Sequence, residues 1–534
     1  MTLSPYALFV AVTWPAWMLL AGMPEPGRMA EQGLLTCALG LAFLALPLTQ
    51  RTLWLITLAI FPAAAVWGVF AHEFGGPPHS GTLIALMHSS LAENQEWIIS
   101  HALQSAMVGL LAAGSVAMLI RAPRQPVFVQ AQRRKISAAL LMLALFAFLQ
   151  HDYWYGKRSS WALVTSSDIE AIWPAGPLWK ISDALWGRLP DAILSPPEFV
   201  NLDRAAPQPV TKHFDGPLAV IFVIGESHRT DTLNPIRRPE LARGLAQRLA
   251  DHRMLWLEDV CAGATLTAYS VPALVTGATP DAALTQARDQ PSGLAYFKQA
   301  GFSTAWISNQ DDGIFGEAGW DLGIFARRTS AHKPDEIVLP ALNRFLHSAG
   351  RVAVVVHLQG SHFDYVNRYP ADAGLIPVDG LSGLALERAH FANSEGYSAG
   401  ILARILGMID SDSRPAVVVF TSDHGENLKD DARNLWRHAG SKLVSAAELK
   451  VPAFVAWNQT YATLNPDGLA TVAGNADKPL AHWNFFPLWL RLGGVESAAA
   501  PAAASPDSSS FMPLADRRFR NTANGQIESC ENLH

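Results

Sequence analysis

The chain has 534 residues, which is enough for more than one domain. Half of its residues are hydrophobic and only 16% are charged, a balance that is typical of a membrane part joined to a soluble part. The formal net charge of −6 excludes a strongly basic surface, so we expect no nucleic-acid partner.

The first 151 residues contain apolar stretches that are each near the length of a membrane-spanning helix. They lie at 4–23, 33–49, 53–71, 101–120 and 136–151. No basic segment precedes the first stretch and no small-residue cleavage site follows it, so we interpret it as a retained helix and not as a signal peptide. We predict an N-terminal α-helical membrane domain of five spans over residues 1–151, embedded in the lipid bilayer.

The orientation of these spans follows from the distribution of Lys and Arg between the loops. The loop from 73 to 100 carries no basic residue, whereas the loop after the fourth stretch carries Arg121, Arg124, Arg133, Arg134 and Lys135. The basic loop is expected in the cytoplasm, which places everything after residue 152 on the far side. In a Gram-negative bacterium this predicts a multi-pass inner-membrane protein with its catalytic domain in the periplasm.

The rest of the chain divides by composition. Segment 152–215 mixes tryptophans with basic residues and prolines, which fits interfacial bridging helices and a linker. Segment 496–534 is rich in Ala, Pro and Ser at its start and polar after that, and we expect a flexible C-terminal tail. Between them, over 216–495, apolar β-branched runs at 218–224, 303–307, 352–357, 416–421 and 451–456 alternate with helical patterns at 239–250, 334–348 and 385–409. This alternation predicts an α/β domain with a mostly parallel central sheet.

The cysteine content limits how the fold is stabilised. Cys37, Cys261 and Cys530 form no CxxC pair, which excludes a cysteine-based zinc site. At most one disulfide is possible, and its pairing does not follow from the sequence.

Acidic residues and histidines follow the predicted strands, at the positions where sites form in parallel sheets. Glu226 follows the first strand, and Asp423 with His424 follows the fourth. These oxygen and nitrogen ligands suit a catalytic Zn²⁺ with one further position to fill. Each residue by itself is more often a helix cap or a surface charge; their combination at the strand ends favours a metal site.

The segment 261–272 is a small, polar, Gly-containing loop that runs into Pro272. We expect this proline in the first turn of a helix, where free amides and the helix dipole favour an anion such as phosphate. The Thr267 hydroxyl is the expected fourth metal ligand and the nucleophile, because coordination lowers the pKa of a hydroxyl. The alternative is that the Thr and Ser side chains only cap the helix.

Three more histidines lie close to these motifs in the sequence. His362 follows the third predicted strand, and His438 follows Asp423 and His424 along the chain. Beside such a site an imidazole protonates a leaving oxygen, binds transferred phosphate or holds a second metal. His357, at the end of the third strand, either contributes to the site or packs in the core.

The order of these motifs resembles that of the membrane-bound phosphoethanolamine transferases of the alkaline-phosphatase/sulfatase superfamily, over nearly the whole chain. The resemblance rests on Gly225-Glu226-Ser227 with Arg229, on 267–272, on 360–362 with 368–370, on 422–426 and on 438–440. It implies a sulfatase-like α/β fold and zinc held by Glu226, Thr267, Asp423 and His424.

The resemblance also implies roles for individual residues. Thr267 becomes phosphoethanolaminated during the reaction, and His362 and His438 serve the phosphate group or a second zinc. We further expect Arg229, Asn309 and His357 to bind substrate.

Some positions depart from the pattern of the family. The lipid A branch carries several disulfides, and Ala273 stands where that branch has a cysteine. The segments 306–310 and 357–362 are closer to the branch that acts on inner-core sugars or periplasmic glucans. Asn-Pro-Ile at 234–236 replaces the expected Asn-Gly-Tyr. These departures bear on the acceptor and less on the metal site.

The resulting expectation is an enzyme that transfers phosphoethanolamine from phosphatidylethanolamine to lipopolysaccharide (core or lipid A) or a periplasmic glycan, through a phosphoethanolamine-Thr267 intermediate and with Zn²⁺ as cofactor. Three alternatives stay open: a membrane-tethered phosphodiesterase or sulfatase-like hydrolase, a phosphoglycerol transferase, and a catalytically inactive sulfatase-fold scaffold. The presence of Glu226, Thr267, Asp423 and His424 together argues against the scaffold.

Overall fold

The structure is a computed structural model, which describes residues 206–282, 290–310, 321–325, 334–439 and 443–533, together with 113, 116 and 120. The described residues from 206 onward belong to one compact unit. The five expected spans and most of the expected bridge lie outside the described residues. Within the described part of the chain, no helix combines the length and the apolar character that a bilayer crossing requires.

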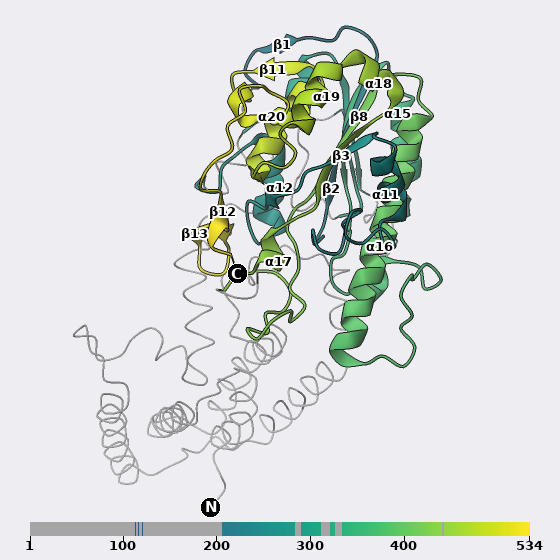
Figure 1. The fold of residues 1–534 in the computed structure, drawn as a ribbon, viewed down its shortest axis with the longest axis vertical. Coiled ribbons are helices and arrows are strands. Elements are labelled where there is room, and N and C mark those ends of the chain that lie inside the picture. The colour runs from purple at the N-terminus through teal and green to yellow at the C-terminus, as the bar shows by residue number, and fades with distance from the viewer. Residues whose placement is uncertain are drawn as a thin grey trace, which may run out of the picture. The chain divides into compact units, whose positions relative to one another are not determined.

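A seven-stranded sheet forms the centre of this unit (Figure 1). The strand order is β3-β9-β8-β2-β7-β5-β6. The strands from β8 to β6 are parallel, and β9 is antiparallel to both of its neighbours, so the sheet is mixed. In sequence order the strands are β2 (Leu218–Gly225), β3 (Met254–Trp256), β5 (Ser303–Ser308), β6 (Leu322–Phe325), β7 (Arg351–His357), β8 (Ala416–Ser422) and β9 (Ala453–Trp457).

All five strands that the sequence predicts are present, as β2, β5, β7, β8 and β9. Strands β2 and β8 are buried along their whole length, as continuous β-branched and apolar runs predict for a sheet covered on both faces. The short strands β3 and β6, which have little hydrophobic length, were not predicted.

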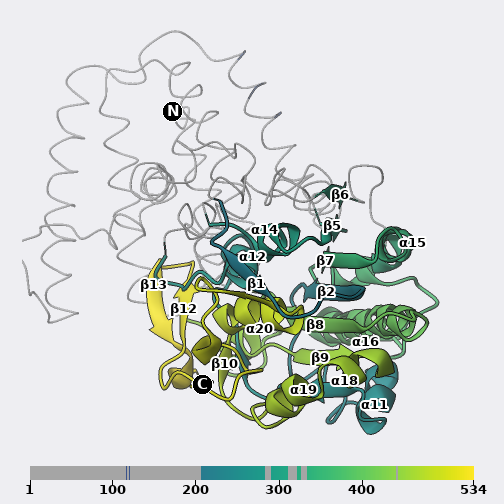
Figure 2. The same ribbon diagram turned by 90° about the horizontal axis from the view of Figure 1, so that it is seen from above.

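Helices cover both faces of the sheet (Figure 2). Side chains alternate along β2, so that Phe222 and Ile224 enter one core and Ile221 and Val223 enter the other. The first core contains α12 (Thr267–Thr276), α14 (Gly293–Gln299) and α20 (Phe485–Leu492); the second contains α11 (Arg243–Ala250), α15 (Leu339–Leu346) and α16 (Gly383–Asp410). The helical predictions at 239–250, 334–348 and 385–409 correspond to the second group.

Short elements complete the unit. The small strands are β1 (Val210–Lys212), β4 (Val260–Cys261), β10 (Leu480–Ala481), β11 (Val495–Ser497), β12 (Arg518–Asn521) and β13 (Gln526–Ser529). Among the described residues, the remaining α-helices are α17 (Ala446–Leu449), α18 (Gln459–Leu464) and α19 (Pro466–Ala473). The 3-10 helices are η4 (Asp335–Val338), η5 (Tyr365–Arg368), η6 (His482–Asn484), η7 (Ala502–Ala504) and η8 (Cys530–Asn532).

Helix α12 begins earlier than expected. Its first residue is Thr267, preceded by Leu266 in an extended conformation, and Pro272 lies inside the helix. The prediction that Pro272 sits in the first turn is therefore wrong. Pro272 lies past the first turn, where it removes one amide donor from the helix, and Gly277 ends the helix in the left-handed conformation with φ of 73°. The helix start consequently lies at Thr267 itself.

The segment 496–533 is not the flexible tail that its composition predicts. Strand β11 pairs with β1, so that 210–212 also belong to this unit and not to the bridge. Phe511, Phe519 and Cys530 are buried in the first core. Cys530 forms a disulfide with Cys261 across a sequence separation of 269 residues. A few large side chains and one covalent link order a segment whose average composition is that of a linker.

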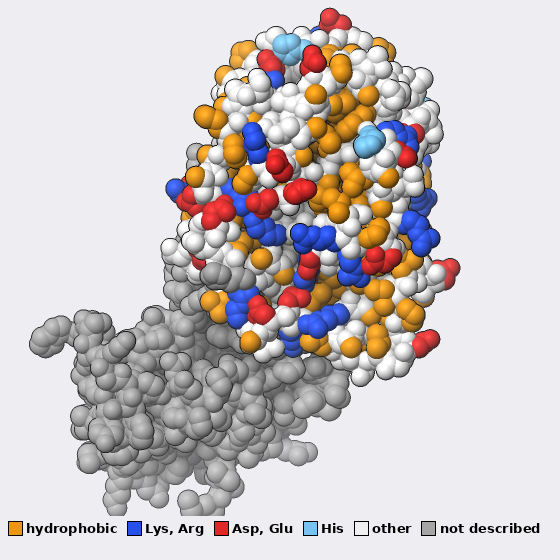
Figure 3. Space-filling view, in the orientation of Figure 1, with side chains coloured by type: hydrophobic (Ala, Val, Ile, Leu, Met, Phe, Trp, Pro, Cys, Tyr) orange, Lys and Arg blue, Asp and Glu red, His pale blue; other side chains and the backbone are white. Residues whose placement is uncertain are grey.

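The outer surface is of mixed character. On the face that Figure 3 shows, basic and acidic side chains are interspersed with small apolar areas. Large exposed hydrophobic side chains are spread over several elements; among them are Ile236, Leu375, Leu464 and Met512. A scattered distribution of this kind is ordinary for a folded surface.

We expect Phe222→Ala to destabilise the domain. The Phe222 side chain is fully buried, and its ring lies 5.2 Å from Trp489 and 6.3 Å from Phe485. Truncation of such a ring costs about 3–5 kcal/mol, which corresponds to a melting temperature lower by roughly 5 °C for a domain of this size. Thermal unfolding of the detergent-solubilised protein measures this change. Ile236→Ala, at an exposed position, is the matched control and should melt with the wild type; equal melting of all three proteins would contradict the packing described.

Candidate active site

Three neighbouring strands end at the same level and deliver polar residues to one edge of the sheet. In the parallel register, Ser422 of β8 lies opposite Gly225 of β2, and His357 of β7 lies opposite Ile224. The amide of Asp423 continues this ladder by donating to Gly225 O at 3.0 Å. Glu226 and Asp423 therefore emerge side by side, as expected for a site at the carboxyl ends of parallel strands.

The four residues expected to hold a metal converge at this edge. Thr267 Oγ1 donates to Glu226 Oε2 at 3.2 Å and lies 3.2 Å from His424 Nε2. His424 Nε2 lies 3.2 Å from Asp423 Oδ2 and 3.4 Å from Glu226 Oε1. Thr267 reaches the group because it is the first residue of α12, so its hydroxyl projects from the end of the helix.

Ser227 fixes the relation between the two carboxylates. It adopts a left-handed conformation with φ of 62°, which is unfavourable for a residue other than glycine. In this conformation its amide donates to Asp423 Oδ1 at 3.1 Å and its hydroxyl donates to Glu226 Oε1 at 2.9 Å. Backbone strain of this kind often accompanies a functional site, and here it orients two ligand oxygens.

The chemistry of this group fits a divalent cation. Glu226 and Asp423 are both fully buried, and Asp423 Oδ2 accepts no hydrogen bond from the described residues. Burial and the neighbouring charge of Asp423 raise the pKa of Glu226 well above its usual range. Burial lowers the pKa of His424 to about 4, so its imidazole is neutral at neutral pH, which is the form that binds metals. Its Nδ1 lies 2.9 Å from Gly425 O, which leaves Nε2 facing the carboxylates.

A second group of ligand atoms shares Glu226. One ligand atom each from Glu226, His362 and His438 lie within 4.8 Å of one another. The same holds for one ligand atom each from Glu226, Asp423 and His424. The rings of His424 and His438 are 3.9 Å apart between centroids. His362 and His438, predicted from separate motifs, thus lie with Glu226 at the same edge of the sheet.

The loop that carries His438 is fixed by buried polar contacts. Arg437 and Ala439, on either side of the histidine, both have positive φ, at 60° and 53°. The Ala439 amide donates to Glu448 Oε1 at 2.8 Å, and the Arg437 amide donates to Asn427 O at 2.8 Å. These bonds hold a conformation that the sequence alone disfavours.

Glu426 supports His438 directly. His438 Nδ1 lies 2.9 Å from Glu426 Oε2, and the Glu426 side chain is fully buried. Burial raises the pKa of Glu426 to about 8 and lowers that of His438 to about 4. Glu426 was part of a motif quoted from the sequence, but no role followed from the pattern.

Gly360 permits the close approach of two loops. It has φ of 55°, and a Cβ at this position would lie 2.4 Å from Glu226 O. The next amide, of Ser361, donates to that same carbonyl at 2.9 Å. The loop that leads to His362 can therefore lie directly against Glu226 only because residue 360 has no side chain.

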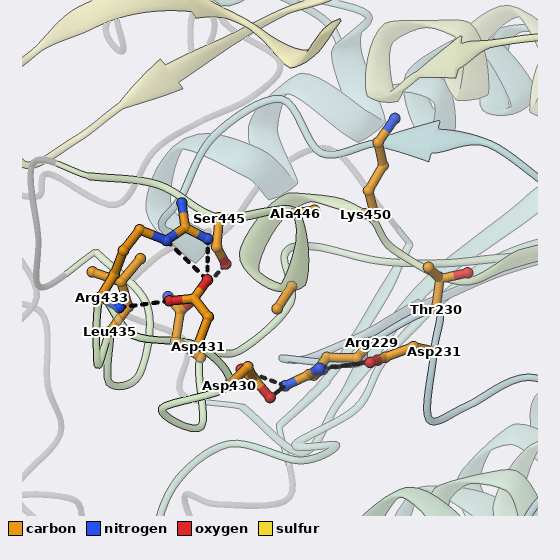
Figure 4. Close-up of a pocket in the computed structure, with 12 residues that line it drawn as sticks. Arg229, Thr230, Asp231, Asp430, Asp431, Arg433, Leu435, Ser445, Ala446 and Lys450 are labelled. Atoms are coloured by element: carbon orange, nitrogen blue, oxygen red, sulfur yellow. Dashed lines mark hydrogen bonds and ion pairs between the residues drawn. The ribbon is translucent and has the colours of Figure 1, made fainter. Parts of the chain in front are cut away.

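Arg229 lines a pocket of about 320 Å³ together with Asp231, Asp430 and other residues (Figure 4). Its guanidinium donates to Asp231 at 2.6 and 2.8 Å and to Asp430 at 2.9 and 3.0 Å. It also donates to Glu426 O at 3.2 Å. The charge of Arg229 is thus matched by carboxylates of this chain, and its expected contact with substrate stays a prediction.

The other two expected substrate ligands also make contacts within the protein. Asn309 donates to Asp335 Oδ1 at 2.9 Å, and this carboxylate also accepts from the amides of the 359–360 turn. His357 is fully buried at the end of β7, with its ring edge-on to Trp306. Burial lowers the pKa of His357 to about 4. For both residues the contacts described hold the site's framework, and binding of substrate stays a prediction.

The sequence did not predict the contact between Gln310 and Glu226. Its Nε2 donates to Glu226 Oε2 at 3.0 Å and to Leu358 O at 3.1 Å. Gln310 follows Asn309 directly after β5, in the segment 306–310 that the sequence analysis singled out. The sequence does not show which of the two side-chain amides turns toward Glu226. Only the pairing of β5 with β7 brings Gln310 to this carboxylate.

The family model described as Sulfatase matches residues 219–495, more than half of the chain. The chain belongs to the sulfatase family. It is 24% identical over 424 residues to phosphoethanolamine transferase EptC of Escherichia coli K12, covering 71% of this chain and 72% of that protein. It is 27% identical over 265 residues to phosphoethanolamine transferase EptA of Helicobacter pylori, covering 45% and 48%.

Solved structures share the fold of this sulfatase-family protein. The zinc complex of the C-terminal periplasmic domain of EcEptC from Escherichia coli has a TM-score of 0.56 at 20% identity, covering 62% of this chain and 98% of that chain. The integral membrane protein lipooligosaccharide phosphoethanolamine transferase A (EptA) from Neisseria meningitidis has a TM-score of 0.70 at 18% identity, covering 95% and 96%. The expected resemblance to phosphoethanolamine transferases and the sulfatase-like fold are confirmed, and the names of the relatives support the expectation of an enzyme.

We expect Gln310→Ala to weaken metal binding at the Glu226 group of this sulfatase-family site. Loss of the 3.0 Å hydrogen bond removes a group that orients a ligand oxygen, and losses of this kind typically lower metal affinity about tenfold. Titration of the metal-free full-length protein with Zn²⁺ measures the affinity. Gln459→Ala, at an exposed position in α18, should bind as tightly as the wild type. Equal affinities for all three proteins would show that Gln310 does not support Glu226.

Proposed function

We propose that this protein transfers phosphoethanolamine from phosphatidylethanolamine to a lipopolysaccharide or periplasmic glycan acceptor, with Thr267 as the nucleophile. The observation that carries the proposal is the position of Thr267 Oγ1, 3.2 Å from both Glu226 Oε2 and His424 Nε2, at the start of α12. The activities in the names of the similar proteins support phosphoethanolamine as the transferred group.

Zinc is the proposed cofactor. Glu226, Asp423, His424 and Thr267 would hold the ion, because they combine buried carboxylates, a neutral imidazole and a hydroxyl. When bound, zinc lowers the pKa of a hydroxyl and neutralises charge on phosphoryl oxygens. The zinc-bound structure of a similar fold supports this choice of metal.

The first half-reaction loads the enzyme. Thr267 Oγ attacks the phosphorus of phosphatidylethanolamine, a bond forms between them, and the bond from phosphorus to the diacylglycerol oxygen breaks. The Thr267 proton leaves toward Glu226 Oε2, to which the hydroxyl donates. The positive end of the α12 dipole stabilises negative charge on the phosphoryl group.

The leaving oxygen of diacylglycerol must gain a proton, and His362 and His438 are the groups proposed to deliver it. For His438 the proton comes from Glu426, whose pKa of about 8 keeps it protonated at neutral pH and whose Oε2 lies 2.9 Å from His438 Nδ1. Both lie with Glu226 at the site, and His438 is held through Nδ1 by Glu426. In the second half-reaction an acceptor hydroxyl oxygen attacks phosphorus and its proton passes to the histidine that protonated diacylglycerol, while the bond from phosphorus to Thr267 Oγ breaks and Glu226 returns the proton to Thr267. Each proton that the enzyme accepts in one half-reaction is returned in the other, so the full reaction consumes no acid or base.

A second metal ion is the alternative role for these histidines. The ligand atoms of Glu226, His362 and His438 lie within 4.8 Å of one another, which favours a shared carboxylate between two ions. Counting bound zinc in the purified enzyme separates the two roles. One equivalent per chain supports proton delivery, and two equivalents support the second ion.

We propose the inner membrane of a Gram-negative bacterium as the location, with the catalytic domain in the periplasm. The unequal distribution of Lys and Arg between the N-terminal loops supports this orientation. The similarity to an integral membrane protein over 95% of this chain supports a membrane part. The Cys261–Cys530 disulfide favours an oxidising compartment.

We expect Thr267→Ala to abolish loading of the enzyme. Incubation of the zinc-loaded wild type with phosphatidylethanolamine and no acceptor should add the mass of phosphoethanolamine to the peptide that contains Thr267. The Ala variant should lose labelling and transfer by at least about 1,000-fold, whereas Thr267→Ser, which keeps the hydroxyl, should stay within about tenfold of the wild type. Transfer by a folded Ala variant would refute the nucleophile.

The same experiment separates the alternatives. An unlabelled wild-type peptide with free phosphoethanolamine and diacylglycerol accumulating would indicate a hydrolase. Labelling from phosphatidylglycerol in place of phosphatidylethanolamine would indicate a phosphoglycerol transferase. No turnover of either lipid by a zinc-loaded protein would favour the inactive scaffold.

Removal of the metal should abolish transfer without unfolding the protein. We expect the chelated, dialysed enzyme to lose at least about 100-fold of its activity and to regain it with Zn²⁺ but not with Mg²⁺, because a neutral imidazole among the ligands favours zinc. The measurement is transfer rate against bound metal, determined by elemental analysis. Full activity in verified metal-free enzyme would rule out a metal-dependent reaction.

A further inference from the structure

The segment 517–531 lies against the loop that leads into Thr267 (Figure 1). The Arg520 amide donates to Gly263 O at 2.9 Å, and Arg520 O accepts from the Thr265 amide at 3.3 Å. Ala264 and Arg520 form a parallel β-bridge. The backbone of β12 therefore satisfies polar groups of a loop that has no regular structure of its own.

Side chains reinforce this contact just before the nucleophile. Thr265 Oγ1 and Thr522 Oγ1 are 2.8 Å apart, and the Thr522 amide lies 3.2 Å from Thr265 Oγ1. Both threonines are buried. A buried hydroxyl pair is costly to leave half-satisfied, so the two segments are held in one register. Thr267 follows Thr265 by only two residues.

Arg520 also reaches α12 and the turn after it. Its guanidinium lies 5.6 Å from the centre of the Tyr269 ring. It donates to Pro280 O at 2.8 Å and to Ala282 O at 3.2 Å. One side chain therefore contacts the first turns of α12 and the segment after its end, which restricts rotation of the helix that presents Thr267.

The segment itself is anchored at both ends. The disulfide joins Cys530 to Cys261, at the start of the loop. Arg517, which is buried, pairs with Glu531 at 2.7 Å and with Asp259 at 2.9 Å. The hairpin of β12 and β13 closes between these anchors. A covalent bond and a buried guanidinium thus fasten 517–531 to 259–261.

We propose that residues 517–531 are a clamp that positions Thr267 for attack, with Thr522 and Arg520 as positioning residues. The inference rests on the proposed role of Thr267 as nucleophile. Glu226, Asp423 and His424 are anchored by β2 and β8, whereas the clamp contacts the 259–265 loop and α12. Loss of the clamp should therefore displace the nucleophile and leave the other three ligands in place. Displacements of about 1 Å at a reacting atom commonly slow a reaction on the order of 100-fold.

The test compares Thr522→Val with Thr522→Ser in the full-length, zinc-loaded enzyme. Thr522→Val keeps the shape but removes the hydroxyl, and should slow labelling of Thr267 from phosphatidylethanolamine by at least about tenfold. Thr522→Ser should recover labelling to within about threefold. Thr211→Val, on the exposed strand β1, is the matched control and should label at the wild-type rate. The Cys261→Ala/Cys530→Ala double variant should change in the same direction as Thr522→Val.

Two further readouts separate positioning from general damage. Hydrogen exchange of the peptide 261–269 should accelerate in Thr522→Val but not in Thr211→Val. In the labelling assay, run at saturating Zn²⁺, bound zinc per chain should equal that of the wild type, because Glu226, Asp423 and His424 are untouched and only the fourth ligand is displaced. Wild-type labelling and exchange in Thr522→Val would overturn the clamp, and so would a loss of zinc that accounts for the slower labelling.

The hydrogen-exchange measurement tests the clamp independently of the proposed reaction. If the wild type is never labelled at Thr267, the proposed nucleophile fails. Faster exchange at 261–269 in Thr522→Val would then still support a clamp on this loop, and unchanged exchange would refute it.

Discussion

The burial of two carboxylates at the ends of adjacent parallel strands is the constraint on which the rest of the structure depends. Glu226 and Asp423 have no exposure to water, and their mutual repulsion must be compensated. The left-handed Ser227 donates to both, and a neutral imidazole approaches them. A site that concentrates negative charge in this way is suited to a cation first and, through the cation, to a phosphoryl group.

The parts of this arrangement that the sequence predicted are those with a local signal. Strands such as β2 and β8 are long, apolar and β-branched, so their existence and their ends could be read directly. Because parallel strands place their carboxyl ends together, the convergence of Glu226, Asp423 and His424 followed from the strand ends alone. Thr267 came from motif order, and it lies 3.2 Å from Glu226 and His424 at a helix start earlier than Pro272 suggested; its role stays a prediction.

The parts that the sequence did not predict depend on contacts between distant segments. The reversal of β9 leaves no mark in its composition, because a buried strand has the same residues in either direction. Gln310 faces Glu226 only through the pairing of β5 with β7. The segment after 495 has the composition of a linker, and its order comes from a few buried side chains, such as Phe519 and Arg517, and from one disulfide.

The ribosome synthesises Cys261 well before Cys530, since 269 residues separate the two cysteines of the disulfide. A nascent chain that has been extended past His438 already contains every proposed metal ligand, yet the contacts of residues 263–265 with Arg520 and Thr522 cannot form until β12 has left the ribosome. Segments so far apart in the chain associate late in folding. If the clamp acts as proposed, an unfinished chain has a metal site without an aligned nucleophile, so reactivity toward membrane lipids begins only with the finished polypeptide.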